Sequence, residues 1–189
     1  MRIGIVGAGK FGLVLAKIAA ENENQVLLYS RRAEEVNSIN DDGKSLSGVE
    51  FPSNKKTSAT ASTKDLVNCD VLLITVPSKD FRSTIESLDI DIKTTKIVSC
   101  VKGFEEKTGK LMSEILEDDF GVPENNIFIL SGPNLSKEIS DKELTGTVIA
   151  GTDKDFVDQL SKSMSNNYFI PFSNSDRYSY ADLETSSCE

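Results

Sequence analysis

The stretch Ile3-Gly-Ile-Val-Gly-Ala-Gly-Lys-Phe-Gly12 decides the fold of this chain. Its first four residues, Ile3-Gly-Ile-Val6, form a short apolar run that predicts a buried strand. A turn with three glycines follows, and residues 11–20 repeat apolar side chains at helical spacing. The sequence therefore predicts a strand, a tight turn and a helix in direct succession.

The three glycines of that turn have separate physical roles. Gly7 permits the tight turn, Gly9 lets the backbone approach a pyrophosphate without a Cβ in the way, and Gly12 lets the helix pack close to the sheet. The N–H groups and the positive dipole end of the helix would then face the phosphates. The pattern favours a dinucleotide site, and the alternative is a glycine-rich turn that holds no ligand.

Strands and helices alternate along the rest of the chain. Residues 71–76 are apolar almost throughout, which suits a parallel strand covered by helices on both faces. The alternation predicts an α/β fold of the Rossmann type with a doubly wound, mostly parallel sheet. Further strands are expected at 25–29, near Thr57, and at 96–100, 126–130, 147–150 and 168–172, and helices at 32–39, 79–88, 108–117, 153–164 and in a short segment ending at Ile139.

Composition narrows the function classes. The chain has 189 residues, a net charge of −9 and no histidine. An acidic surface without a basic stripe argues against a nucleic-acid partner, and no apolar run approaches the ~18 residues that span a bilayer. Acid–base chemistry would fall to Lys, Asp or Glu. Three separated cysteines without metal-binding spacing predict no metal site and fit a reducing cytoplasm, so we expect a cytoplasmic protein.

The second expected strand ends in Tyr29-Ser-Arg-Arg32, where NAD-specific sites place an acidic residue for the adenosine ribose. No acid is present there. Arg31 or Arg32 could bind a 2′-phosphate, or a guanidinium could lie over the adenine. The alternative is a pair of solvated surface arginines. The cofactor is therefore NAD or NADP, and this feature alone slightly favours NADP.

Four segments of the sequence form a recognisable set, and the two most specific contain a Lys-Gly-x-Glu-x-x-Thr-Gly pattern and a Ser-Gly-Pro-x-x-x-Lys-Glu pattern. The segments are Gly7-Ala-Gly-Lys-Phe-Gly12, Thr75-Val-Pro-Ser-Lys-Asp-Phe-Arg82, Val101-Lys-Gly-Phe-Glu-Glu-Lys-Thr-Gly109 and Ser131-Gly-Pro-Asn-Leu-Ser-Lys-Glu138. Together they resemble the N-terminal domain of the NAD(P)-dependent glycerol-3-phosphate dehydrogenase family over residues 1 to about 177.

The resemblance implies hydride transfer between NADH or NADPH and glycerone phosphate, giving sn-glycerol 3-phosphate. It also implies roles for individual residues. Lys102 would touch both cofactor and substrate and is the catalytic candidate. Cofactor binding would fall to Gly7, Gly9, Lys10 and Phe11 with Gly12 at the phosphates, Arg31 at the adenosine end, Phe81 near the nicotinamide, and Ser136; Gly132 and Asn134 would line the substrate site.

The residues around the expected substrate site can also be interpreted without the resemblance. Lys102 follows a strand at the carboxyl edge, where an ammonium could hold substrate charge or polarise a carbonyl, or it is an exposed loop lysine. Asn134 could cap the next helix, contact substrate, or do both. Lys137 and Glu138 read as a solvated helix face rather than a catalytic pair.

The family has a second, all-helical domain that supplies its main catalytic lysine, and the match decays after Arg177. We therefore expect a NAD(P)-binding domain at residues 1–173 and a tail at 174–189, the truncated start of the helical domain. The alternatives are a non-catalytic dinucleotide-binding module or partner subunit, and another oxidoreductase of ketopantoate or 6-phosphogluconate type. An exposed, partly apolar docking face predicts association with a second copy or with a helical-domain partner.

Overall fold

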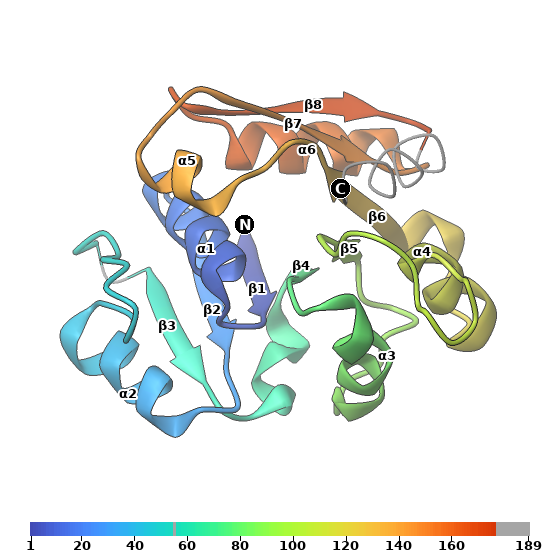
Figure 1. Cartoon of the computed structure of the whole chain (residues 1–189), viewed down its shortest axis with the longest axis horizontal. Helices are drawn as coiled ribbons and strands as arrows, with labels where there is room; N and C mark the ends of the chain where they lie inside the picture. The colour runs from blue at the N-terminus through green and yellow to red at the C-terminus, as the bar shows by residue number, and fades with distance from the viewer. Residues whose placement is uncertain (55, 177–189) are drawn as a thin grey trace.

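The computed structural model describes residues 1–54 and 56–176, which build an eight-stranded sheet (Figure 1). The strand order is β3-β2-β1-β4-β5-β6-β7-β8, and all neighbours are parallel except β6 and β7. The prediction of a doubly wound, mostly parallel sheet is confirmed. The strands are β1 (Arg2–Val6), β2 (Gln25–Tyr29), β3 (Thr57–Thr60), β4 (Val71–Ile74), β5 (Ile97–Ser99), β6 (Ile127–Ser131), β7 (Thr145–Ala150) and β8 (Phe169–Asn174).

Helices connect the strands and cover both faces of the sheet (Figure 1). None of those in the described residues is long and apolar enough to cross a membrane. The helices are α1 (Lys10–Glu21), α2 (Ala33–Asp42), α3 (Ser78–Ser87), α4 (Met112–Glu114), α5 (Ser136–Ser140) and α6 (Lys154–Met164), with 3₁₀ turns at Thr63–Asn68 and Glu124–Asn126 and a π turn at Ile115–Asp119.

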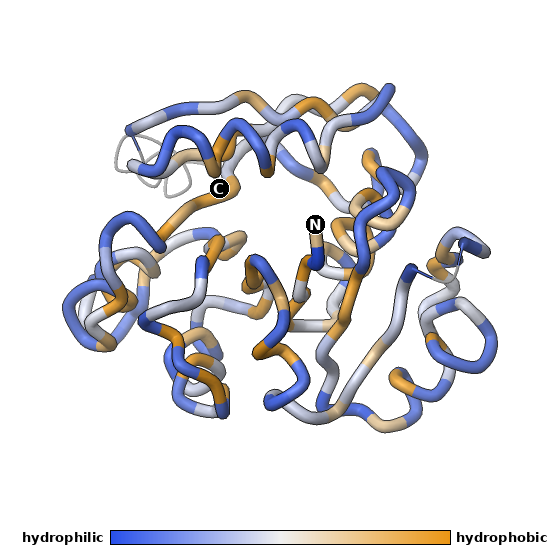
Figure 2. Tube along the Cα trace, turned by 180° about the vertical axis from the view of Figure 1, so that it is seen from behind, coloured by the Kyte–Doolittle hydropathy of each residue, from blue (hydrophilic) through white to orange (hydrophobic). Residues whose placement is uncertain are grey.

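Two apolar layers hold the helices to the sheet. Ile3 and Ile5 of β1 are fully buried against α1, whereas Leu72 and Ile74 of β4 belong to the layer under α3 and α4. The alternation follows from the two-residue period of a strand. Figure 2 shows the hydrophobic stretches of the strands in the interior and hydrophilic stretches along outer loops and helix faces. The near-continuous apolar strands are therefore explained by burial on both faces.

The strand order places β1 between β2 and β4. The chain moves outward from β1 to β3, then returns to β4 on the other side of β1 and continues to β8. Open α/β sheets bind ligands outside the carboxyl ends of their strands at such a reversal. The glycine turn that follows β1 lies at this position.

The structure differs from the sequence prediction in the segment before α4. A helix was expected over residues 108–117, but α4 begins at Met112. Phe104 and Leu111 form an isolated antiparallel bridge, and Gly109 has a φ of +73° inside the loop that this bridge closes. That left-handed glycine favours a turn over a helical residue. The last strand, expected at 168–172, extends to Asn174 as β8, and residues 177–189 of the expected tail lie outside the described residues.

Gly12 allows the first helix to approach the turn. A Cβ built at Gly12 would lie 2.1 Å from the carbonyl oxygen of Gly7 and 2.5 Å from Oγ1 of Thr75. We expect Gly12→Ala to lower the free energy of unfolding by about 1–3 kcal/mol, because backbone must move to admit the methyl group. Urea unfolding followed by circular dichroism measures the change.

Gly9→Ala is the matched control for that substitution. A Cβ at Gly9 meets nothing within 4 Å, and the Gly9 φ of −79° is one that alanine adopts freely. Its cost should stay below about 1 kcal/mol, the range for a change of N-cap residue. Equal destabilisation by both substitutions would contradict the role given to Gly12.

Candidate functional site

A cavity of about 400 Å³ lies at the carboxyl ends of β1, β2 and β4. Three loops line it, at residues 6–9, 29–32 and 75–77, together with one face of α3. Its position is the one predicted by the strand order, and a cavity of this size can hold part of a dinucleotide. The structure thus brings Gly7, Gly9 and Arg31 of the expected cofactor residues together in one cavity.

Thr75 fixes the glycine turn to the neighbouring strand. Its Oγ1 lies 3.1 Å from the carbonyl oxygen of Val6 and 3.0 Å from that of Gly7 and donates to this pair. Gly7 has a φ of +118°, a backbone conformation that residues with a Cβ rarely adopt. The hydroxyl therefore satisfies the carbonyl of Gly7 in the turn and adds a second bond to the carbonyl of Val6, which also accepts from the backbone N–H of Thr75.

The amino end of α1 is open toward a ligand. Gly9 is its N-cap, no side chain caps the helix, and its first turn carries no acidic residue. The positive end of the helix dipole is therefore uncompensated there within the described residues. The bare backbone of Gly9, with open space where a Cβ would stand, fits the approach of a pyrophosphate.

The two arginines after β2 have different surroundings. Arg32 donates through Nη2 to Oε2 of Glu35 at 3.0 Å and to the carbonyl oxygen of Ala8 at 3.4 Å. The Glu35 side chain is only 1% exposed, so Arg32 supplies the charge that this buried carboxylate needs. Arg31 lines the cavity, and its side chain has no hydrogen bond or ion pair with the described residues. Arg32 lines the same cavity, so the two arginines differ in their partners and not in their access to a ligand.

Lys102 and the Ser131–Asn134 turn follow β5 and β6, which are parallel to β1 through β4. They therefore reach the same edge of the sheet as the glycine turn. Lys102 is exposed, and Gly132 has a φ of +146°. The 400 Å³ cavity does not include them; the expected site residues outside its lining are Lys10, Phe11, Gly12, Phe81, Lys102, Gly132, Asn134 and Ser136.

Phe81 does not line the cavity. Its ring is fully buried in the layer under α3 and contributes nothing to the cavity surface. Phe81 and Ile85 occupy the inward stripe of α3, whose four-residue spacing points both to the core. The ring thus packs behind the helix that lines the cavity, and its place near a nicotinamide stays a prediction.

Asn134 does not cap the next helix, so that interpretation is wrong. The N-cap of α5 is Leu135, and Asn134 Nδ2 instead donates to Oγ1 of Thr147 at 2.9 Å. Thr147 in turn donates to the carbonyl oxygen of Ser131 at 2.8 Å. Asn134 Oδ1 is buried and accepts no hydrogen bond from the described residues. The amide is thus held by β7 and keeps an unused acceptor.

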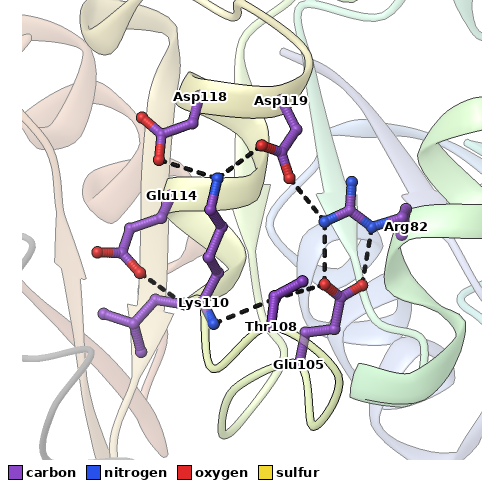
Figure 3. Close-up of polar contacts among 8 residues, drawn as sticks. Arg82, Glu105, Thr108, Lys110, Glu114, Asp118 and Asp119 are labelled. Carbon is purple, nitrogen blue, oxygen red and sulfur yellow. Dashed lines mark hydrogen bonds and ion pairs between the residues drawn. The ribbon is translucent and has the colours of Figure 1, made fainter.

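A charged network joins α3 to the loop after Lys102 (Figure 3). Arg82 donates to both carboxylate oxygens of Glu105 and to Asp119, and Lys110 donates to Asp119. Hydrogen bonds from Arg82 and Thr108 lower the pKa of Glu105 to about 2. Those from Lys110 and Arg82 lower the pKa of Asp119, and the bonds to Glu105 and Asp119 raise the pKa of Arg82.

A family described as NAD-dependent glycerol-3-phosphate dehydrogenase N-terminus matches residues 2–157. The chain belongs to this family. The match covers the glycine turn, the cavity and the Lys102 loop, and the resemblance suggested by the sequence motifs is confirmed.

Proteins named glycerol-3-phosphate dehydrogenase [NAD(P)+] are similar to this chain over most of its length. The one from Corynebacterium diphtheriae is 33% identical over 180 residues, and the one from Corynebacterium kroppenstedtii is 34% identical over 182 residues. These matches cover 93% and 92% of this chain but only 54% and 53% of the two relatives. The chain spans about half the length of the curated relatives it matches.

Solved structures agree with the family assignment. A glycerol-3-phosphate dehydrogenase from Coxiella burnetii superposes with a TM-score of 0.79 at 27% identity, covering 93% of this chain and 54% of that one. A yeast glycerol-3-phosphate dehydrogenase superposes with a TM-score of 0.80 at 21% identity, covering 98% and 58%, which supports the fold alone. The family's first half therefore accounts for the described strands and helices.

The α3 wall of the cavity was missed by sequence reasoning. Asp80, Ser83, Thr84 and Ser87 line it together. Their spacing of three, four and seven residues marks one helix face, opposite the buried stripe of Phe81 and Ile85. That polar stripe was the available signal, although a solvated surface helix gives the same pattern. No cluster of His, Cys, Asp and Glu that could hold a metal occurs among residues 1–54 and 56–176.

Gly9→Ala also tests the phosphate approach. The added methyl group would stand at the open amino end of α1, where the fold tolerates it but a pyrophosphate in contact with the backbone does not. We expect the dissociation constant for NADH or NADPH to rise at least tenfold while the unfolding midpoint changes little. Unchanged affinity, measured by quenching of tyrosine fluorescence or by calorimetry, would argue against a phosphate at this turn.

Proposed function

We propose that this chain is the dinucleotide-binding part of a glycerol-3-phosphate dehydrogenase. The whole protein would interconvert glycerone phosphate and sn-glycerol 3-phosphate with NADH or NADPH. The observation that carries the proposal is the open Gly9 turn at the uncapped end of α1, at the switch point of a chain that belongs to this family. Neither an exposed glycine nor a family match alone would specify where the cofactor lies.

We assign the cofactor phosphates to the first turn of α1 and the glycine turn, where Lys10 and Phe11 follow Gly9. The adenosine end is assigned to Arg31, which lines the cavity without an ion pair to the described residues. Phe81 is assigned to the nicotinamide end, with its buried ring packed behind the helix that lines the cavity. A bound nicotinamide would supply the hydride; the residues of the chain bind, orient and hold charge.

The substrate end is assigned to Lys102, Gly132 and Asn134, and Ser136 to the cofactor beside it. Support comes from strand direction, because these residues follow β5 and β6 at the edge that carries the glycine turn. The exposed Lys102 ammonium can hold a substrate phosphate or stabilise oxyanion character at the carbonyl. Asn134 Oδ1 supplies an acceptor for a substrate hydroxyl once the site is assembled.

One observation favours a second candidate function, a dinucleotide-binding module without turnover. The residues assigned to substrate lie outside the cavity that the described residues form, so the cofactor side is built while the substrate side is open. Hydride chemistry needs exclusion of water from the reacting atoms. This candidate would bind a dinucleotide and act with a partner.

We also propose a cytoplasmic location and association with a second copy or with a helical partner. The support for association is a set of exposed apolar side chains near α5, β7 and β8: Leu135 at 58%, Leu144 at 74% and Phe172 at 60% exposure. Large apolar side chains with this exposure are candidates for an interaction surface. The support for the location is that Cys69 and Cys100 are free thiols, as suits a reducing compartment.

The two candidates are separated by one titration. Calorimetry with NADPH and then NADH should show binding in the micromolar range, and glycerone phosphate is added to the same cell while absorbance at the nicotinamide band is followed. Oxidation of the cofactor, or binding of glycerone phosphate to the cofactor complex without oxidation, supports the dehydrogenase. Cofactor binding without oxidation or substrate binding supports the module, and loss of both bindings would overturn the whole assignment.

Arg31 provides a test of cofactor preference. If its guanidinium binds a 2′-phosphate, Arg31→Ala should weaken NADPH roughly 10- to 100-fold, the value of one or two charged hydrogen bonds, and leave NADH within about threefold. Arg32→Lys is the control, because it keeps a cation beside the buried Glu35 carboxylate. Equal loss of NADPH and NADH on Arg31→Ala would instead indicate stacking on the adenine.

A further inference from the structure

Helix α3 has two functional faces. One face lines the cavity with Asp80, Ser83, Thr84 and Ser87. Arg82 leaves the helix in another direction and reaches the loop that carries Lys102 (Figure 3). The same short helix therefore borders the cofactor cavity and holds the segment assigned to substrate.

The contact between Arg82 and Glu105 is a two-pronged one. Arg82 Nε donates to Glu105 Oε1 at 2.8 Å, and Arg82 Nη2 donates to Oε2 at 2.9 Å. Thr108 Oγ1 donates to the same Oε2 at 2.6 Å. The side chains of Arg82 and Glu105 are 30% and 14% exposed. A bidentate arginine contact of limited exposure fixes both distance and orientation, which a single exposed ion pair does not.

Glu105 is also the backbone anchor of the loop. Its N–H donates to the carbonyl oxygen of Lys110 at 2.9 Å, and its own carbonyl oxygen accepts from the N–H of Gly109 at 2.8 Å. Glu105 stands three residues after Lys102, and Gly103 between them has a φ of +83°. The path from the anchor to the Lys102 backbone is therefore short and passes through a sharply turned glycine.

Asp119 ties a third segment into the network. It accepts from Arg82 Nη2 and from Lys110 Nζ, both at 2.6 Å, and Lys110 also lies 3.1 Å from Asp118. Arg82 thus links α3, the loop at 101–111 and the π turn at 115–119. Charges that neutralise one another in a network of this kind order the segments that carry them.

We propose that Arg82, acting through Glu105, is a positioning residue for Lys102: the ion-pair network fixes the Lys102 loop to the helix that forms the cofactor wall. The role given to Lys102 rests on the proposed function, whereas the tethering of its loop does not. The Glu and Thr of the Lys-Gly-x-Glu-x-x-Thr-Gly pattern then have a purpose in that pattern, since both belong to the tether.

The tether is present throughout the working pH range. The pKa of Glu105 is lowered to about 2 by Arg82 and Thr108, so its carboxylate remains ionised well below pH 5. Because this pKa lies below the ordinary value of 4.5, the tether's stabilisation is present above about pH 4.5 and is lost as the pH falls toward 2. Measurements at pH 6 to 7 therefore report the intact network.

Backbone ¹⁵N relaxation of the labelled full chain measures the tether directly. Lys102 and Gly103 should have order parameters near 0.85, and Arg82→Gln should lower them below about 0.6 while Gly9 keeps its value. Lys137→Gln is the control, because it removes an exposed ion pair with Asp141 remote from the loop. Unchanged order at Lys102 and Gly103 in a folded Arg82→Gln chain would overturn the proposal.

Two further variants test the proposal in the event that Arg82→Gln does not fold. Glu105→Gln keeps the size of the side chain and the bond from Arg82 to Asp119, so it should loosen Lys102 even where Arg82→Gln fails to fold. Arg82→Lys keeps the positive charge but loses the planar guanidinium that makes two parallel bonds. It should give order parameters at Lys102 and Gly103 between those of the unchanged chain and those of Arg82→Gln. Full order in both folded variants would show that the loop does not depend on this contact.

Ligand titration separates the tether from the proposed function. With NADH or NADPH saturating, Glu105→Gln should weaken the binding of sn-glycerol 3-phosphate at least tenfold. It should weaken the cofactor by a smaller factor, because Lys102 is only one of the residues assigned to the cofactor. Equal weakening of both ligands would indicate a purely structural role. If the unchanged chain binds no sn-glycerol 3-phosphate, the proposed substrate assignment fails, and the relaxation at Lys102 still decides the tether.

Discussion

The close approach of α1 to the glycine turn is the constraint on which the rest of the site depends. Gly12 has no room for a Cβ because the carbonyl of Gly7 and the hydroxyl of Thr75 occupy that space. The approach turns the amino end of α1 toward the ends of β1 and β4, and it makes Thr75 a partner of two turn carbonyls. One missing methyl group therefore sets the helix axis, the cavity wall and the open backbone at Gly9.

The main elements could be predicted because burial on both faces leaves an unambiguous pattern. Residues 71–74 are apolar at every position, and β4 is buried throughout. The loop at 101–111 could not be predicted, because its shape depends on Arg82 from a distant helix and on a turn at Gly109. The apolar spacing that suggests a helix over 108–117 comes from residues 111–116, and Gly109 is the local signal against extending that helix to residue 108.

The residues of the candidate site also differ in how far the sequence alone predicts them. The glycine turn and Arg31 could be located from sequence because their roles depend on neighbours in the chain. The buried position of Phe81 and the bond from Asn134 to Thr147 depend on packing between elements, which no single segment encodes. The sheet order does bring Lys102 and Gly132 to the edge of the sheet that carries the glycine turn. The loops that follow the strands then determine how far these residues lie from the cavity.

The uncapped end of α1 also has a kinetic meaning for an acidic chain. The net charge of −9 repels an anionic dinucleotide at long range. At physiological ionic strength this repulsion decays over about 8 Å, whereas the dipole and N–H groups of the first turn act at contact. We therefore expect the amino end of α1 to lower the dissociation rate of the cofactor more than it raises the association rate.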